Sequence, residues 1–439
     1  MGLQFMQSGI TGLHAEQQRL NVIGNNVANS NTTGFKGQSV NFEDNISQTL
    51  KSATGASRSL GGTNSESVGM GVSVASITND MSQGAMNATN RNLDCAIDGD
   101  GYFMVAAGPE MFDEADCIKL DPSTHKIVST PTGTSITYTR DGSFALDNQG
   151  NLLTADGHRV LGYSMIGRNL MSASGATKYY GDVASISRNQ GSATINDDGN
   201  GGSIDTAASS VIGEYLGAGG VTDVLDSVSK VTGRAAETAT NASSVVKSGD
   251  IAFVNADDID LRADSSNLHT LRIPDSVKEI YVKQVPDGGG GYTNQVSVKS
   301  VKIKSFSVGD DGIIKGVLDD GRVAALGQIA MATFTNAGGL DKAGSNYLNT
   351  SANSGDAIVR EGAAKEIKDP NAAAYNASYK AIDNSGAFGK VRNGYLEMSN
   401  VDLAKEFTDM IVASRSYQAN GKTITQGDTI LQTLVGLIR

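Results

Sequence analysis

Apolar residues recur at every seventh position in two stretches of this chain, one at each end. Near the start, the series and its flanking residues are Leu3, Met6, Ile10, Leu13, Leu20 and Val27. Near the end, they are Leu403, Phe407, Met410, Tyr417, Ile424, Leu431, Val435 and Ile438. Such a repeat is typical of helices that pack lengthwise against other helices. We therefore expect two terminal helices that pack on each other or on neighbouring copies; packing only on their own domain is the alternative.

The ends of both helices can be placed from the polar residues that flank them. The first helix is expected over residues 3–28, because the Asn, Ser and Thr cluster that follows competes for backbone hydrogen bonds and Gly34 accepts positive φ. The second is expected to begin after Ser399, with Asp402 three residues on as a capping-box variant, and to reach about Leu437.

Three glycines interrupt the C-terminal helix: Gly421, Gly427 and Gly436. Each one costs about 1 kcal/mol relative to alanine in a free helix. Their presence indicates close helix–helix approach, or a tail that becomes ordered only among its neighbours.

The long region between the helices has the pattern of β structure. Apolar residues alternate with polar ones from Val68 onward, and residues 138–163 contain three short apolar runs separated by Asp-Gly and Asn-Gln-Gly. These features predict a β-meander with primed-type turns. The segment 107–137 is interpreted as an inserted loop.

The sequence therefore predicts a mainly β protein with paired N- and C-terminal α-helices, an α+β fold with discontinuous domains. A helical inner domain and two β-rich outer domains are expected. The predicted parts are a terminal assembly domain (1–30 with 396–439), a linker or extended stretch (31–68), an inner β domain (69–166 with 303–395) and an outer β domain (167–302).

Charge and hydropathy exclude several partners and locations. The net charge of −12 argues against nucleic acid and anionic membranes as partners. No run of apolar residues is long enough to span a bilayer. The first basic residue is Arg19, so the charged start of a secretory signal peptide is missing. We expect a cytosolic protein, or one exported without a cleaved signal.

No motif for catalysis, metal binding or cofactor binding stands out. The sequence Gly421-Lys422-Thr423 resembles the end of a phosphate-binding loop, but position 416, where that loop needs glycine, is serine. The four histidines are scattered and lack metal-ligand spacing. We therefore expect no enzyme activity, no cofactor and no small-molecule substrate. A secreted β-rich enzyme with a carboxylate pair is the remote alternative.

The two cysteines are expected to be inert. Cys95 lies in an apolar strand pattern, which favours a small buried side chain. Cys117 lies in an acidic segment interpreted as a loop, and a disulfide between the two is the alternative.

Several segments resemble the bacterial flagellar rod and hook proteins. Residues 20–36 (LNVIGNNVANSNTTGFK) are similar to the N-terminal signature of that family, and residues 416–439 are similar to the C-terminus of its hook members. Two further pairs of segments match in the family's order: 93–103 with 138–163, and 326–348 with 395–411.

This resemblance implies a structural subunit that self-assembles into the flagellar hook, a curved flexible tube that transmits torque from rod to filament. The terminal helices would line the export channel. The implied partners are many copies of the chain itself, the rod and hook–filament junction proteins, the hook cap and the flagellar type III export apparatus. Through that apparatus the subunit would reach the extracellular hook without cleavage.

Two features bear on this implied role. Phe42 and Ile46 match the family's export-gate motif, a Phe followed four residues on by an apolar residue. The stretch 43–68 is longer than in short-form hook proteins and resembles the distal rod protein, in which it stiffens the tube. The distal rod protein is therefore the near alternative, although the long middle region and the C-terminal sequence favour the hook.

Overall fold

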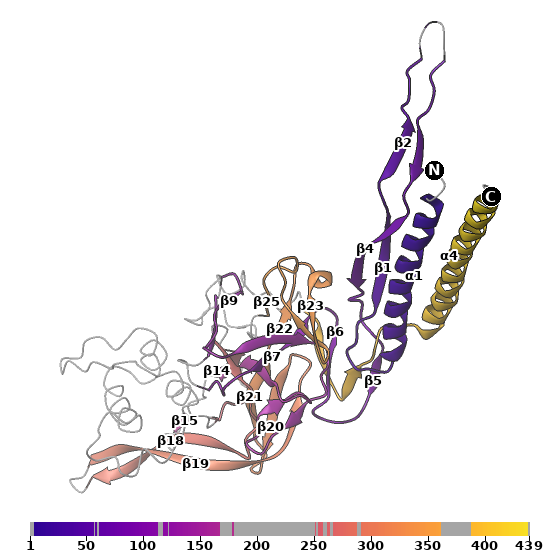
Figure 1. The fold of residues 1–439 in the computed structure, drawn as a ribbon. Helices are drawn as coiled ribbons and strands as arrows, with labels where there is room; N and C mark the ends of the chain where they lie inside the picture. Colours follow the sequence, from indigo (N-terminus) through magenta and orange to yellow (C-terminus); the bar gives the residue numbers. More distant parts are fainter. Residues whose placement is uncertain are drawn as a thin grey trace. The chain divides into compact units, whose positions relative to one another are not determined.

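The described part of the chain is mainly β structure with one long α-helix at each end (Figure 1). This computed structural model describes residues 4–56, 58, 61–112, 117–121, 123–166, 178–179, 251, 253–257, 261–263, 267–287, 291–360 and 388–437. Helix α1 spans Gln4–Ala28 and helix α4 spans Leu403–Leu437. Both predicted terminal helices are therefore confirmed.

The chain divides into two compact units. The first contains Met1–Met86, Ala337–Gly339 and Glu397–Arg439, and the second contains Asn87–Asn336 and Leu340–Leu396. The first unit thus combines both terminal helices with residues predicted to be a linker and with the start of the predicted inner β domain.

Helix α4 begins at Leu403 because Asp402 caps it. Asp402 Oδ1 accepts hydrogen bonds from the backbone N–H of Ala404 at 2.9 Å and of Lys405 at 3.4 Å. Ser399 lies before the helix, where its hydroxyl accepts from Val401 N at 3.3 Å. The cap is therefore Asp402 and not Ser399, consistent with the preference for Asp at this position.

The described residues between 38 and 79 form a two-stranded antiparallel ribbon, so most of the stretch 31–68, predicted to be a linker or extended, is extended chain paired into β-strands. Strand β1 (Gln38–Asp44) pairs with β4 (Val72–Asn79), and β2 (Ser47–Lys51) pairs with β3 (Glu66–Gly69). The strands β1 and β4 contact α1, and the ribbon continues beyond that helix (Figure 1). Both β2 and β3 are exposed along their whole length. Exposed strands need no apolar face, so the polar composition gave no strand signal.

The remaining strands are short, apart from two. They are β5 (Met86–Ala88), β6 (Cys95–Asp98), β7 (Tyr102–Ala107), β8 (Ile118–Leu120), β9 (Ile127–Ser129), β10 (Ser135–Thr139), β11 (Ala145–Leu146), β12 (Leu152–Leu153), β13 (Arg159–Tyr163), β14 (Met165–Ile166), β15 (Lys178–Tyr179), β16 (Arg262–Ala263), β17 (Asn267–Thr270), β18 (Ser276–Asp287), β19 (Gly291–Val308), β20 (Ile313–Leu318), β21 (Val323–Ile329), β22 (Met331–Thr333), β23 (Asp341–Gly344), β24 (Tyr347–Asn349), β25 (Ile358–Val359), β26 (Lys390–Asn393) and β27 (Tyr395–Glu397). A 3₁₀ turn spans Ala337–Gly339.

The predicted meander is present as β11–β12–β13, but its turns are not of the primed type. Gly150 N donates to Asp147 O at 3.1 Å, and Gly157 N donates to Thr154 O at 3.0 Å. Only the glycine of each turn has positive φ, 85° for Gly150 and 84° for Gly157. A type I′ turn needs positive φ at two consecutive residues. These turns are therefore not type I′, and each one ends in a glycine in the left-handed conformation.

One apolar core unites most of the second unit. Phe103 and Phe144 pack edge to face with ring centroids 5.2 Å apart. The same cluster includes Leu271, Val277 and Ile329. Part of the range 251–302, predicted to belong to a separate outer domain, therefore shares the core of the predicted inner domain, through Ile251, Phe253, Leu271, Ile273, Val277 and Val301. Most of 167–250 lies outside the described residues.

The segment 107–137 is also part of this fold. It contains β8 and β9, and β8 pairs with β17 through Ile118 and Leu268, both fully buried. The interpretation as an inserted loop missed these strands because each has only three residues.

Both cysteines are free and buried. Free thiols were predicted for both, but burial only for Cys95; Cys117 lies immediately before β8 and not on an exposed acidic loop. Burial raises the pKa of the Cys95 thiol to about 12, and the nearby Asp94 carboxylate adds to that rise. Cys117 Sγ donates to Asn267 Oδ1 at 3.3 Å.

The burial of both thiols predicts that they are unreactive in the native chain. Since thiolates are the reactive form, we expect the native chain to resist alkylation near pH 8. In urea, where the chain is unfolded, we expect both thiols to be alkylated. Rapid labelling of the native chain with a chromogenic disulfide reagent would contradict this.

Candidate assembly surface

The helices α1 and α4 lie side by side and run in opposite directions (Figure 1). Glycines allow their close approach. A Cβ at Gly12 would lie 2.7 Å from Asn420 Nδ2, and one at Gly427 would lie 2.8 Å from Met6 Cγ. The close approach predicted from Gly427 is therefore present within one chain. The same position on Gly421 or Gly436 has no described neighbour within 4 Å.

Polar contacts fix the register of the two helices. Arg19 Nη2 lies 3.0 Å from Asp409 Oδ1. Asn26 is buried and donates through Nδ2 to Glu406 Oε1 at 3.1 Å and to Gln38 O at 2.8 Å. A single amide thus connects α1, α4 and the start of β1.

Three segments of the first unit meet around one buried ion pair. We call this region the three-segment joint: residues 34–37, 80–85 and 397–400. Lys36 Nζ lies 2.7 Å from Glu397 Oε1 and donates to Ser82 O at 2.6 Å. Glu397 Oε1 also accepts from Gly84 N at 2.9 Å. The two charged side chains are only 4% and 0% exposed, so these bonds replace the water that both charges have lost.

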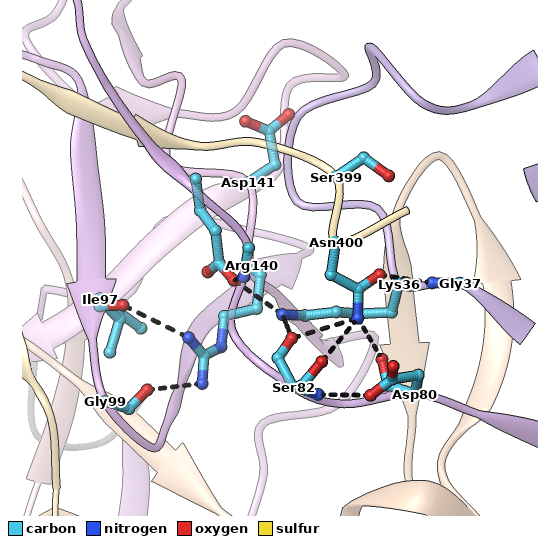
Figure 2. A network of polar contacts seen from close by, with 12 residues as sticks. Lys36, Gly37, Asp80, Ser82, Ile97, Gly99, Arg140, Asp141, Ser399 and Asn400 are labelled. Carbon is cyan, nitrogen blue, oxygen red and sulfur yellow. Dashed lines mark hydrogen bonds and ion pairs between the residues drawn. The ribbon is translucent and has the colours of Figure 1, made fainter. Parts of the chain in front are cut away.

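Asn400 links the same segments from the other side (Figure 2). Its Oδ1 accepts from Gly37 N at 2.8 Å, and its Nδ2 donates to Asp80 O at 2.9 Å and to Ser82 O at 3.2 Å. The Ser82 backbone N–H, which donates to the Asp80 carboxylate, is the largest influence that lowers the pKa of Asp80; the charge of Lys36 contributes less. Nearly every polar group that these segments bring together is therefore satisfied.

Backbone contacts complete the joint. Gly34 N donates to Glu397 O at 2.8 Å, and Met398 N donates to Ala85 O at 2.9 Å. A Cβ at Gly84 would overlap the carbonyl oxygen of Met398. The chain can therefore pass the start of the C-terminal segment only with glycine at this position.

Much of the predicted apolar series on α4 is exposed in the single chain. We define the outer stripe as Leu403, Phe407, Ile411, Tyr417 and Val435, which are 40–64% exposed. At 3.6 residues per turn, these positions lie on one side of the helix. The helix therefore presents an apolar surface that its own chain leaves uncovered.

The other predicted residues divide into three groups. Those that are half-buried are Met6, Leu13, Leu20, Val27, Met410, Ile424 and Leu431. Ile10 is 44% exposed. Leu3 and Ile438 lie outside the described residues. The structure thus brings together only part of each series. Ile424 of α4 is one of the residues that face α1: its Cγ1 would lie 3.3 Å from a Cβ built on Gly9.

Most of the residues that are most buried on α1 were missed by the sequence reasoning. Gly9, Gly12, Ala15 and Asn26 are all buried, and none of them is a large apolar residue. Ile23, which flanks the predicted apolar series on the same face, is buried as well. A search for small residues at spacings of three and four would have found Gly9 and Gly12. The charged pair of the three-segment joint left no such signal.

The two residues of the predicted export-gate motif lie on the ribbon. Phe42 is opposite Val74 on β4 and is 38% exposed. Ile46, between β1 and β2, is 85% exposed. Both side chains are accessible in the single chain, and their role stays a prediction.

The described residues contain neither a membrane-spanning helix nor a metal-binding cluster. No helix there is long and apolar enough to cross a membrane. No group of three or more His, Cys, Asp or Glu side chains there is arranged to hold a metal ion.

Three family models match the sequence. One described as the C-terminal part of flagellar basal body rod FlgEFG proteins matches residues 392–437, and one described as flagella basal body rod protein matches residues 6–36. The third, the D1 domain of flagellar hook protein FlgE/F/G, matches residues 127–200. The first two cover most of α1, the start of the three-segment joint and α4.

Relatives match over the whole length. The flagellar basal-body rod protein FlgG of Bacillus subtilis is 30% identical over 437 residues, covering 100% of both chains. The flagellar hook protein FlgE of Treponema pallidum is 29% identical, covering 98% of this chain and 99% of the relative, and FlgE of Escherichia coli is 28% identical with 98% of each covered. The crystal structure of Helicobacter pylori FlgE2 matches with a TM-score of 0.31 and 11% identity, covering 71% of this chain and 100% of that one.

Proposed function

Because the chain belongs to the flagellar rod and hook protein family, we propose that it polymerises into the flagellar hook, a curved tube that transmits torque from rod to filament. Hook proteins from several bacteria align with it from end to end at 28–29% identity. On this proposal the chain is a structural component and carries out no catalysis.

The observation that carries the proposal is the outer stripe of α4. A large apolar side chain gains about 1.5–3 kcal/mol when it moves fully from water into a packed interior, so each residue of the outer stripe, already partly covered, gains roughly half of that. Five such residues on one helix provide a strong drive for association with other copies, even after the entropy lost on association is subtracted. In the proposed tube, α1 and α4 form the inner layer and the outer stripe packs on neighbouring subunits.

Further partners follow from this role. The rod and the hook–filament junction proteins would contact the two ends of the tube, and the hook cap its growing end. The flagellar type III export apparatus would deliver the subunit uncleaved to the extracellular hook. Phe42 and Ile46 are the residues that we propose this apparatus recognises.

A rod subunit is the second candidate. Two observations favour it: the exposed ribbon formed by β2 and β3, and the full-length match to a protein named as a basal-body rod protein. Both candidates are tubes built from the same terminal helices, so they differ in the shape of the polymer.

Electron microscopy of the polymerised full chain tests both candidates. We expect tubes, because the single chain leaves the outer stripe exposed for other copies to cover, and we expect them to be curved if the chain forms the hook. Straight tubes would identify the rod candidate. A chain that stays monomeric at high concentration and high ionic strength would contradict both.

A further inference from the structure

Acidic side chains outnumber basic ones along the contact between α1 and the first half of α4. Glu16 and Arg19 lie one turn apart on α1, and Glu406 and Asp409 lie on α4. Arg19 pairs with Asp409 at 3.0 Å. Among the described residues, the side chain of Glu406 accepts a hydrogen bond from the neutral amide of Asn26 and forms no ion pair. One guanidinium therefore faces three carboxylates.

Glu16 has the least favourable surroundings of the three carboxylates. Its Oε2 is buried and has no hydrogen-bond partner among the described residues. Burial raises the pKa of Glu16, and the charge of Arg19 opposes that rise only in part. Burial is also the main cause of the raised pKa of Glu406, to which the charge of Asp409 adds.

The elements packed around this contact supply little compensation. On α4, Lys405 is exposed, and its charge acts on Asp80 as well as on Glu406. Strands β1 and β4 also pack on α1, and their only charged residues are Glu43 and Asp44, at the end of β1. His14 of α1 is exposed.

We propose that these carboxylates make the pairing of α1 with α4, and therefore polymerisation, sensitive to pH, with the polymer favoured in mild acid. A carboxyl group whose pKa is higher in the paired state than in the separated state binds its proton more tightly when paired. Pairing is then unopposed below the ordinary pKa and weakens as the pH rises through the raised value. This inference rests on the proposed function, since the property that changes with pH is the stability of the polymer.

The experiment is a titration of polymer stability. The critical concentration of the full chain is measured by sedimentation from about pH 5 to about pH 8 at constant ionic strength. We expect it to be roughly threefold lower at the acid end, a change typical of a partly exposed charge interaction. Glu16→Gln should flatten this profile and lower the critical concentration near neutral pH. Glu406→Gln should act in the same direction.

Glu66→Gln is the matched control. Glu66 is an exposed carboxylate of β3, away from the contact between α1 and α4, and the variant changes the net charge as much as Glu16→Gln does. It should keep the wild-type profile, which separates the local effect from the general loss of charge near the pI of 4.8.

Three results would overturn the inference: a flat wild-type profile, an unchanged profile in both Glu16→Gln and Glu406→Gln, or equal flattening by Glu66→Gln. Failure to polymerise at any pH would instead refute the proposed function, and this inference with it.

Discussion

Replacing Lys36 with methionine should destabilise the three-segment joint by about 3–5 kcal/mol, because it leaves a buried carboxylate without its counter-charge. The Glu397 side chain has no exposed surface to which its charge could turn. We expect amide hydrogen exchange in residues 80–85 and 397–400 to accelerate by at least roughly a hundredfold, the factor that corresponds to this energy. Exchange in the core of the second unit should not change.

Two further variants test the cause. In Lys36→Met with Glu397→Gln, the buried charge is removed and the amide oxygen can still accept from Gly84 N, so most of the protection should return. Lys405→Met removes an exposed lysine from the same unit and should change the free energy of unfolding by no more than about 0.5 kcal/mol. If Lys36→Met behaved like Lys405→Met, the buried pair would not hold the joint together.

Phe407→Asp should abolish polymerisation without unfolding the chain. Phe407 is 50% exposed in the single chain, so an aspartate there is tolerated in the monomer. In the proposed tube, the same carboxylate would be buried without a partner, at a cost of several kcal/mol. We expect the critical concentration to rise by at least roughly a hundredfold, while the melting of the second unit stays at its wild-type temperature.

The matched control lies on the polar side of the same helix. Gln426 is exposed and lies away from the outer stripe, so Gln426→Asp should polymerise normally. Ile424→Asp should also prevent polymerisation, but for a different reason: Ile424 faces Gly9, so its substitution should separate α1 from α4 in the monomer. Normal tubes from Phe407→Asp would show that neighbouring copies do not cover the outer stripe.

The terminal helices could be predicted because their signal is periodic and local. The seven-residue series identified α1 and α4, and the flanking polar residues placed the ends of α1 within one residue and the start of α4 three residues too early. The same series overestimated how much of each helix is buried within the chain. A repeat identifies an apolar side, but it does not say whether the partner is the same chain or another copy.

The joint and the ribbon could not be predicted, for two different reasons. Lys36 and Glu397 are single charged residues in polar surroundings, and only the fold brings them together. The outer part of the ribbon, β2 with β3, is exposed on both faces, so burial imposes no alternation there. The alternation from Val68 onward did indicate β4, but not its pairing with β1. Gly9 and Gly12 were missed for a third reason: glycines that permit close packing add nothing to an apolar pattern.

The separation of the joint's two charges along the chain has a consequence for the order of events in folding. Lys36 and Glu397 are 361 positions apart, so the ammonium group cannot be neutralised until nearly the whole chain is present. Contacts between such distant positions close late, because the intervening loop loses much entropy. A truncated copy would carry an unpaired lysine where the complete copy has a closed joint. We therefore expect the ion pair to form only in a full-length chain, so that only such a chain presents two correctly placed helices to the next subunit.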